Sequence, residues 1–354
     1  MESLWKKTEP ALLAESKSLE ENIETEVCII GGGITGISTA YNLIKQGKKV
    51  VILDRNELAD KVTGHTTAKI TSQHGLFYNY LIEDYGIKFA KKYYLANEEA
   101  IKNIEETIKE ENIDCDFEMQ SAYIFTKDAK ELEKIRKEIG AVKAIKGEAE
   151  FVKTIDTKLK NIQGAIEFPN QAQFNPRKYL KGLVKRIVEE GGRVYENSKV
   201  IELEDEDEIY RVDTEKGSVR AKYVVIATHY PIINMPGFYF MKMYQETSYA
   251  IAVETKEKLF QGMYLQLENP RISLRTAKDG NKTLVIIGGM DHRVGAKIDL
   301  KDAFKELEKV AKEMYPDAKV LYRWNTQDCI TLDKIPYIGE FSKMMPGVFV
   351  RNRL

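Results

Sequence analysis

A glycine-rich segment and an acid near the start of the chain have the residue types and spacing to hold a dinucleotide. Residues 31–36 read G-G-G-I-T-G, and they follow the apolar run 27–30. In such a G-x-G-x-x-G pattern the first glycine allows a sharp turn, the second lets backbone N–H groups approach a pyrophosphate, and the third lets a helix press against the sheet. Asp54 follows a second apolar run, 50–53, and is placed to accept hydrogen bonds from ribose hydroxyls.

The elements that must position these residues are a strand, a helix and a second strand. Ile37, Ala40, Leu43 and Ile44 recur at helical spacing directly after the glycines. The N-terminus of this helix faces the phosphates with its unpaired N–H groups and the positive end of its dipole. The pattern therefore predicts dinucleotide binding, and it leaves open which dinucleotide is bound.

Length, charge and cysteine usage limit the alternatives. A chain of 354 residues favours two domains, and a hydrophobic content of 43% supports a real core. The formal net charge of −1 argues against nucleic acid or an anionic membrane as a main partner. The three cysteines are scattered without a C-x-x-C pair, so we expect neither a disulfide framework nor a metal site. Without an apolar leader or membrane span, we expect a cytoplasmic protein.

The rest of the chain predicts an α/β fold with a second, α+β domain. A polar loop covers 64–75 and a helix covers 87–112, with Phe89, Tyr93 and Ala96 on its apolar face. A charged helix over 128–140 has the Lys/Glu alternation of a solvated face. Other predicted elements are a helix that begins at Pro176 and ends at Glu190, a buried parallel strand from Tyr223, antiparallel strands over 244–254, 263–268, 271–277 and 283–288, and a helix over 300–314.

The order of these elements favours FAD over NAD. An NAD dehydrogenase continues with a third strand soon after the acid, whereas here the next strand of that sheet is expected only near residue 225. A flavin needs a long crevice to which distant parts of the sequence contribute. An NAD(P)-binding protein stays the alternative from another class.

Six segments in this order resemble the D-amino-acid oxidase-like FAD-dependent oxidoreductases, which include glycine and sarcosine oxidases. The resemblance is greatest to a bacterial subgroup that often carries an added Rieske iron–sulfur domain, whose cysteines and histidines are absent from this chain. The matching segments are 29–36, 64–75, Phe174-Asn-Pro, 225–229, 288–292 and Trp324-Asn-Thr-Gln-Asp through 336–339. The resemblance implies a Rossmann-like FAD-binding domain with an interleaved antiparallel-sheet substrate domain.

The resemblance also implies domain boundaries and a set of cofactor residues. After a lead-in over 1–23, the FAD-binding domain comprises 24–78, 173–231 and 325–354, and the substrate domain comprises 79–172 and 232–324. FAD is expected to be non-covalent, because His65 is offset by about one residue from the family's covalent position. The residues expected to contact FAD are Gly31, Gly33, Ile34, Thr35, Gly36, Asp54, Arg55, Thr66, Thr67, Ala68, Lys69, Ile70, Val200, Ala227 and Thr228.

The activity implied is oxidation of an amine or amino acid by hydride transfer to flavin N5, with oxygen or an electron carrier as acceptor. Arg275 and Tyr249 are expected to clamp a substrate carboxylate, since an arginine fork matches a carboxylate bidentately. His74 is expected on the substrate side. The alternatives are a surface salt bridge for Arg275 and a polar surface loop for 64–75.

The end of the chain departs from the family pattern. The family continues after the strand at 347–350 with an Ala-Thr-Gly-type turn and a final helix, whereas this sequence reads Val350-Arg-Asn-Arg-Leu354. We therefore expect that helix to be missing and the FAD affinity to be lowered. Codons for Arg-Asn-Arg can give Gly-Thr-Gly when read one base later, which suggests a frameshift. The alternative function is a truncated flavin-binding pseudoenzyme with little turnover.

Overall fold

A computed structural model describes residues 2–233, 235, 237–296 and 300–351, and its chain divides into two compact units. The glycine-motif unit comprises Trp5–Thr66, Pro176–Thr247 and Thr326–Leu354, and the antiparallel-sheet unit comprises Met1–Leu4, Thr67–Asn175 and Ser248–Asn325. The mixed α/β class with two sheets is confirmed. The assignment of cofactor and substrate roles to the predicted domain segments stays a prediction.

The sheet of the glycine-motif unit is built on parallel strands, as the apolar runs predict. Its strands occur in the order β16-β17-β10-β1-β2-β7, with β8 and β9 continuing from β10. β1 pairs in parallel with both β2 and β10, although β10 lies more than 160 residues later in the chain. The strands are β1 (Asn22–Ile30), β2 (Val50–Leu53), β7 (Arg193–Tyr195), β8 (Val200–Asp205), β9 (Tyr210–Thr214), β10 (Ser218–Ile226), β16 (Ile338–Ser342) and β17 (Met345–Arg351).

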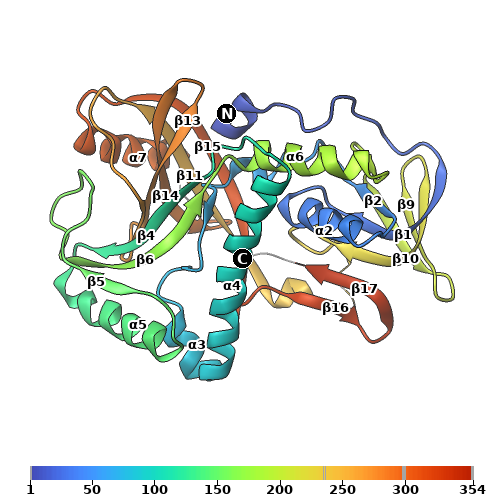
Figure 1. Cartoon of the computed structure of the whole chain (residues 1–354), viewed down its shortest axis with the longest axis horizontal. Coiled ribbons are helices and arrows are strands. Elements are labelled where there is room, and N and C mark those ends of the chain that lie inside the picture. The colour runs from blue at the N-terminus through green and yellow to red at the C-terminus, as the bar shows by residue number, and fades with distance from the viewer. Residues whose placement is uncertain (1, 234, 236, 297–299, 352–354) are drawn as a thin grey trace. The chain divides into compact units, whose positions relative to one another are not determined.

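Among the described residues, two α-helices lie wholly in this unit and a third has most of its residues here. α2 (Ile34–Lys45) and α6 (Pro176–Glu189) lie side by side, and α1 (Leu4–Thr8) belongs to the N-terminal segment (Figure 1). The predicted helix from Pro176 is confirmed. Apolar residues of α6 recur at helical spacing and are buried, because one face of the helix packs inward while charged residues face water.

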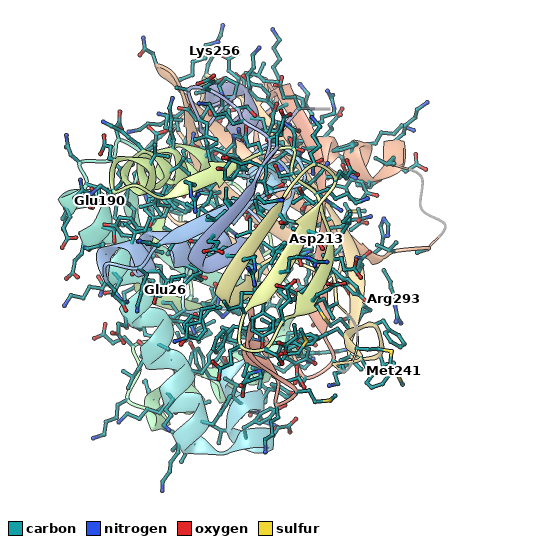
Figure 2. The ribbon with its side chains drawn as sticks, turned by 90° about the vertical axis from the view of Figure 1, so that its right-hand side faces the viewer. Glu26, Glu190, Asp213, Met241, Lys256 and Arg293 are labelled. Carbon is teal, nitrogen blue, oxygen red and sulfur yellow. The ribbon has the colours of Figure 1, made fainter. Side chains whose placement is uncertain are left out.

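An antiparallel extension of the same sheet carries an exposed charge network. Arg211 on β9 forms ion pairs with Glu204, Glu206 and Asp213. Figure 2 labels Asp213 on this extension. Such exposed pairs contribute little to stability, so the network is best described as a solvated surface.

The antiparallel-sheet unit contains the other sheet, whose strands occur in the order β15-β11-β14-β13-β12-β4-β6-β3, with β5 beside β6. β13 pairs antiparallel with β12 and β14, and β12 pairs in parallel with β4. The strands are β3 (Lys69–Ile70), β4 (Glu118–Thr126), β5 (Glu150–Val152), β6 (Gly164–Gln173), β11 (Met243–Glu254), β12 (Met263–Gln266), β13 (Ile272–Asp279), β14 (Lys282–Arg293) and β15 (Lys319–Thr331).

α7 (Leu300–Met314) packs on one face of this sheet, and its predicted bounds are confirmed. Ala303, Phe304 and Leu307 of α7 join a buried cluster with Leu274 of β13 and Ile287 of β14. This cluster defines the α7 face of the sheet. Side chains alternate along a strand, so the neighbours of Leu274 and Ile287 in the sequence point to the opposite face.

The remaining helices, α3 (Tyr78–Tyr85), α4 (Ile87–Glu110) and α5 (Leu132–Ala144), correct two predictions. The buried residues of α4 include Ala90 and Tyr94, whereas Ala96 is exposed, so the packed face is rotated by about one residue from the predicted one. α5 has the predicted solvated face, on which Lys134 and Lys137 are exposed, but Glu138 departs from the prediction because it is buried on the opposite face with Ile135 and Val142. The charged sequence of α5 thus forms a helix with one packed face.

Among the described residues, no helix has both the length and the apolar composition needed to cross a membrane. The predicted absence of a terminal helix concerns the sequence after 351, and residues 352–354 lie outside the described residues.

Candidate functional site

The turn between β1 and α2 has room for glycine alone at two positions. Gly31 has a φ of +111°, and a Cβ there would lie 2.4 Å from the carbonyl oxygen of Ala227. A Cβ at Gly36 would lie 1.9 Å from the carbonyl oxygen of Gly31. Both obstructions are backbone atoms, which cannot rotate away. The turn therefore brings β1, the start of α2 and the end of β10 into close contact.

The N-terminus of α2 has the features of an anion site. Gly33 is its N-cap and has no side chain with which to cap the helix, and no acid occupies the first turn. Ile34 N–H donates to Thr63 Oγ1 at 3.1 Å, and Thr35 is the next residue of that turn. The positive end of the helix dipole is thus left to an external anion. This cradle of small residues fits the pyrophosphate of a dinucleotide.

Asp54 follows β2 and holds the glycine turn directly. Its carboxylate accepts hydrogen bonds from Gly32 N–H at 2.7 Å and Asn56 N–H at 2.8 Å. Desolvation raises the pKa of Asp54, and these two backbone N–H groups oppose that shift. Each carboxylate oxygen retains a second acceptor position, so Asp54 can also accept from a ribose hydroxyl.

Five further predicted cofactor residues lie in this unit. Ala227 N–H donates to Ile30 O at 2.8 Å, which keeps the end of β10 beside β1. Thr228 Oγ1 donates to Tyr230 O, and it follows Ala227 directly. Arg55 is exposed beside Asp54, and Val200 is half-buried at the start of β8. Thr66 also belongs to this unit, where its carbonyl oxygen accepts from Trp5 Nε1 at 2.7 Å.

Arg177 is a buried residue of this unit that the sequence interpretation missed. Its guanidinium donates to the carbonyl oxygens of Leu58 and Ala59 at 3.2 and 3.0 Å, and Ala59 N–H donates to Gly32 O. Arg177 therefore supports the glycine turn indirectly, through the segment that contains Leu58 and Ala59. The sequence signal was its place directly after Phe174-Asn-Pro, a segment that carried the family resemblance.

The predicted cofactor residues from Thr67 to Ile70 belong to the antiparallel-sheet unit. Lys69 and Ile70 form β3, which pairs with Gln173 and Ala172 of β6. Lys69 Nζ donates to Tyr264 O at 3.0 Å and to Ser273 Oγ at 2.6 Å. Its ammonium thus has two neutral acceptors on the sheet.

The environment of Lys69 favours its neutral form. Desolvation, assisted by the charge of Arg275, lowers the pKa of Lys69 from 10.5 to about 7. Between these values the unfolded chain binds the proton and the folded chain does not, so the free energy of unfolding rises with pH from about 7 to 10.5. Below pH 7 the folded state bears the cost of a buried ammonium.

We therefore expect Lys69→Met to remove this pH dependence. The melting temperature of the unsubstituted protein minus that of the variant should increase between pH 6.5 and pH 9, because only the unsubstituted protein gains stability as the amine loses its proton. Thermal unfolding at a series of pH values measures this difference. Lys278→Met, an exposed lysine of β13, is the matched control. A difference that is constant across the series would contradict the prediction.

Arg275 and Tyr249, the predicted carboxylate clamp, are not brought together. Tyr249 packs in the cluster on the α7 face, against Phe304, and its hydroxyl lies 2.9 Å from His292 Nε2. Arg275 follows Leu274, a member of the same cluster, so strand alternation directs it to the opposite face. Because side chains alternate between the two faces of a strand, Arg275 and Tyr249 lie on opposite faces of the sheet. The role of each in substrate binding stays a prediction.

Arg275 is instead occupied by backbone carbonyl groups. Its guanidinium donates to Thr67 O at 3.1 Å, to Ala68 O, and to Phe174 O at 3.2 Å. The alternative interpretation, a surface salt bridge, does not hold, since Arg275 is only 2% exposed. His74 lies elsewhere in this unit, exposed, with its Nδ1 3.1 Å from Tyr93 Oη of α4.

Comparisons with known proteins agree with this geometry. The family described as FAD dependent oxidoreductase matches residues 26–352. YhfW of Bacillus subtilis (strain 168), named as a Rieske 2Fe-2S iron-sulfur protein, is 34% identical over 349 residues, which are 99% of this chain and 68% of that protein. Gamma-glutamylputrescine oxidoreductase of Escherichia coli (strain K12) is 27% identical over 216 residues, 59% of this chain and 50% of that protein.

Two solved structures show the same fold. Glycine oxidase from Geobacillus kaustophilus aligns with a TM-score of 0.76 and 18% identity, covering 93% of this chain and 89% of that chain. L-proline dehydrogenase from P. horikoshii aligns with a TM-score of 0.77 and 18% identity, covering 94% and 88%. Because the family model matches residues 26–352, which are most of its length, the chain belongs to the FAD dependent oxidoreductase family.

Proposed function

We propose that the chain binds FAD non-covalently and oxidises an amine or amino acid. The observation that carries this proposal is the glycine turn, where a Cβ at Gly31 or Gly36 would meet backbone and where the first turn of α2 contains no acid. This geometry supports a bound pyrophosphate, and membership in the family supports FAD as the dinucleotide that contains it.

Each part of the glycine-motif unit has a role in this proposal. The turn from Gly31 to Gly36 donates backbone N–H groups to the pyrophosphate, and Asp54 accepts from the ribose. Ala227 and Thr228 wall the cofactor, with Arg55 and Val200 beside the adenine. Outside these segments, the hydroxyls of Thr66 and Thr67 are proposed to reach phosphate, and Lys69 and Ile70 are proposed to lie along the flavin ring.

FAD, when bound, supplies the acceptor at N5 for a hydride from a carbon next to an amine nitrogen. The protein's part is to orient the substrate and to exclude water, so no acid–base dyad is required. Non-covalent binding is proposed because His65 is offset by about one residue from the family's covalent position; its Nδ1 lies 2.7 Å from Lys61 O. Burial lowers the pKa of His65.

The proposed substrate class follows the names of relatives and structural neighbours. Gamma-glutamylputrescine, glycine and L-proline each carry an amine nitrogen next to an oxidisable carbon, and they appear in the names of three of these proteins. We propose an amine or amino acid for this chain on that shared chemistry, with oxygen or an electron carrier as acceptor. Oxygen consumption measured against reduction of an artificial dye separates the two acceptors.

Anaerobic mixing of the purified, FAD-loaded chain with a panel of primary amines, secondary amines and amino acids tests the proposal. At least one of them should bleach the visible flavin absorbance, and a 2-hydroxy acid, which lacks the nitrogen, should not. Acid precipitation should release the flavin into the supernatant. Bound NAD(P) in place of flavin would overturn the proposal. Stoichiometric flavin that no amine bleaches would favour the alternative of a flavin-binding pseudoenzyme.

A further inference from the structure

We propose that Arg275 is a positioning residue that fixes the backbone of Thr67 and Ala68 against the antiparallel sheet, rather than a ligand of the substrate. The catalytic consequence rests on the proposed function, since these loop residues are proposed to contact FAD. The structural part of the inference concerns the antiparallel-sheet unit alone.

The first argument is the geometry of the guanidinium. Arg275 Nη1 donates to the carbonyl oxygens of Thr67, Ala68 and Phe174, and Nε donates to Thr276 O at 2.9 Å. Three separate chain segments thus converge on one side chain that is 2% exposed. A planar guanidinium can serve several acceptors in fixed directions, which a single ammonium on a flexible stem cannot do equally well.

The second argument is the conformation of the loop that Arg275 holds. Ala68 has a φ of +56°, in the left-handed region that residues with a Cβ seldom adopt. Such a conformation is strained and persists only where surrounding contacts hold it. The hydrogen bonds to the carbonyl oxygens on both sides of this residue supply that constraint.

The third argument is that the loop and the sheet also contact each other through residues other than Arg275. Lys69, the residue after Ala68, donates back to Ser273 Oγ and Tyr264 O on the sheet. Gly288 is the partner of Ser273 on β14, and a Cβ there would lie 3.2 Å from Thr67 Cγ2. The loop therefore contacts the sheet through several side chains, of which Arg275 donates to two of the loop's carbonyl groups.

The experiment compares Arg275→Lys and Arg275→Met with the exposed control Lys278→Met in the full chain. In the absence of FAD, amide hydrogen exchange over residues 66–71 should accelerate by at least about ten-fold in both Arg275 variants and stay unchanged in the control. Exchange at the same rate as the unsubstituted protein would overturn the proposal. This readout needs neither flavin nor turnover, so it decides about Arg275 even if the proposed function fails.

Steady-state kinetics on the FAD-loaded protein separate positioning from substrate binding. A positioning role predicts that kcat falls by a similar factor for an amino acid and for an amine that lacks a carboxylate, with the ratio of their KM values unchanged. A rise in KM confined to substrates with a carboxylate would instead identify Arg275 as a substrate ligand.

Gly288→Ala keeps the proposal testable if an Arg275 variant fails to fold. The added methyl group presses on Thr67 while Arg275 and its charge remain. Faster exchange over residues 66–71 in Gly288→Ala is expected, and unchanged exchange there would count against a loop that is held on the sheet.

Discussion

Gly36→Ala should abolish most FAD binding. The new Cβ would lie 1.9 Å from the carbonyl oxygen of Gly31 and 3.1 Å from its carbonyl carbon, both in the backbone. The clash can be relieved only by moving α2 away from β1 or by changing the turn that Gly31 makes. Overpacking of this kind costs about 1–3 kcal/mol, which corresponds to a loss of roughly 5- to 150-fold in affinity if it falls on the bound state. Flavin titration of the apoprotein measures it.

Two other glycines serve as controls for Gly36→Ala. A Cβ at Gly140, within α5, meets nothing within 4 Å, so Gly140→Ala should leave FAD affinity unchanged and stabilise the chain by about 0.5–1 kcal/mol through helix propensity. At Gly33 the nearest atom to a new Cβ is Thr63 Oγ1 at 3.2 Å, a side chain that can move. Gly33→Ala should therefore stay folded and still bind FAD more weakly, because its methyl group faces the proposed pyrophosphate. Affinity equal to the unsubstituted protein in Gly33→Ala would argue against a cofactor in this turn.

Glu138→Ala should destabilise the antiparallel-sheet unit by roughly 3 kcal/mol or more. Glu138 lies on α5 and is fully buried, and its carboxylate accepts from the N–H groups of Phe77, Tyr78 and Asn79 at 2.7, 2.7 and 2.9 Å. It thereby caps the N-terminus of α3 from a different helix. Desolvation raises the pKa of Glu138, and the three N–H groups oppose that shift. Removal of the carboxylate leaves buried donors without their acceptor.

Thermal unfolding and amide exchange over α3 measure this effect. Glu138→Gln keeps one acceptor oxygen and should lose less than Glu138→Ala, because part of the cap survives. Lys137→Ala, the exposed neighbour on α5, should change stability by less than about 0.5 kcal/mol. Equal melting temperatures for Glu138→Ala and Lys137→Ala would show that the cap does not stabilise α3.

Local sequence determined the elements that carry the glycine turn. A strand, a sharp turn, a helix and a second strand each have a signal within a few residues: an apolar run, glycines at fixed spacing, and apolar residues at helical spacing. The late return of the chain at β10 beside β1 was also readable, because a buried parallel strand is a continuous apolar run. These features depend on neighbours in the sequence, so no tertiary information was needed.

Only the tertiary structure decided which polar side chains are buried and what they bind. The sequence predicts that Glu138 lies on a solvated helix face, yet its carboxylate caps α3, some 60 residues away in the sequence. Arg275 reads as a partner for Tyr249, yet strand alternation places the two on opposite faces, and the guanidinium meets the carbonyl groups of a loop that precedes it by more than 200 residues. The type of a side chain shows which bonds it can form. The acceptor that it finds depends on backbone segments that folding alone brings together.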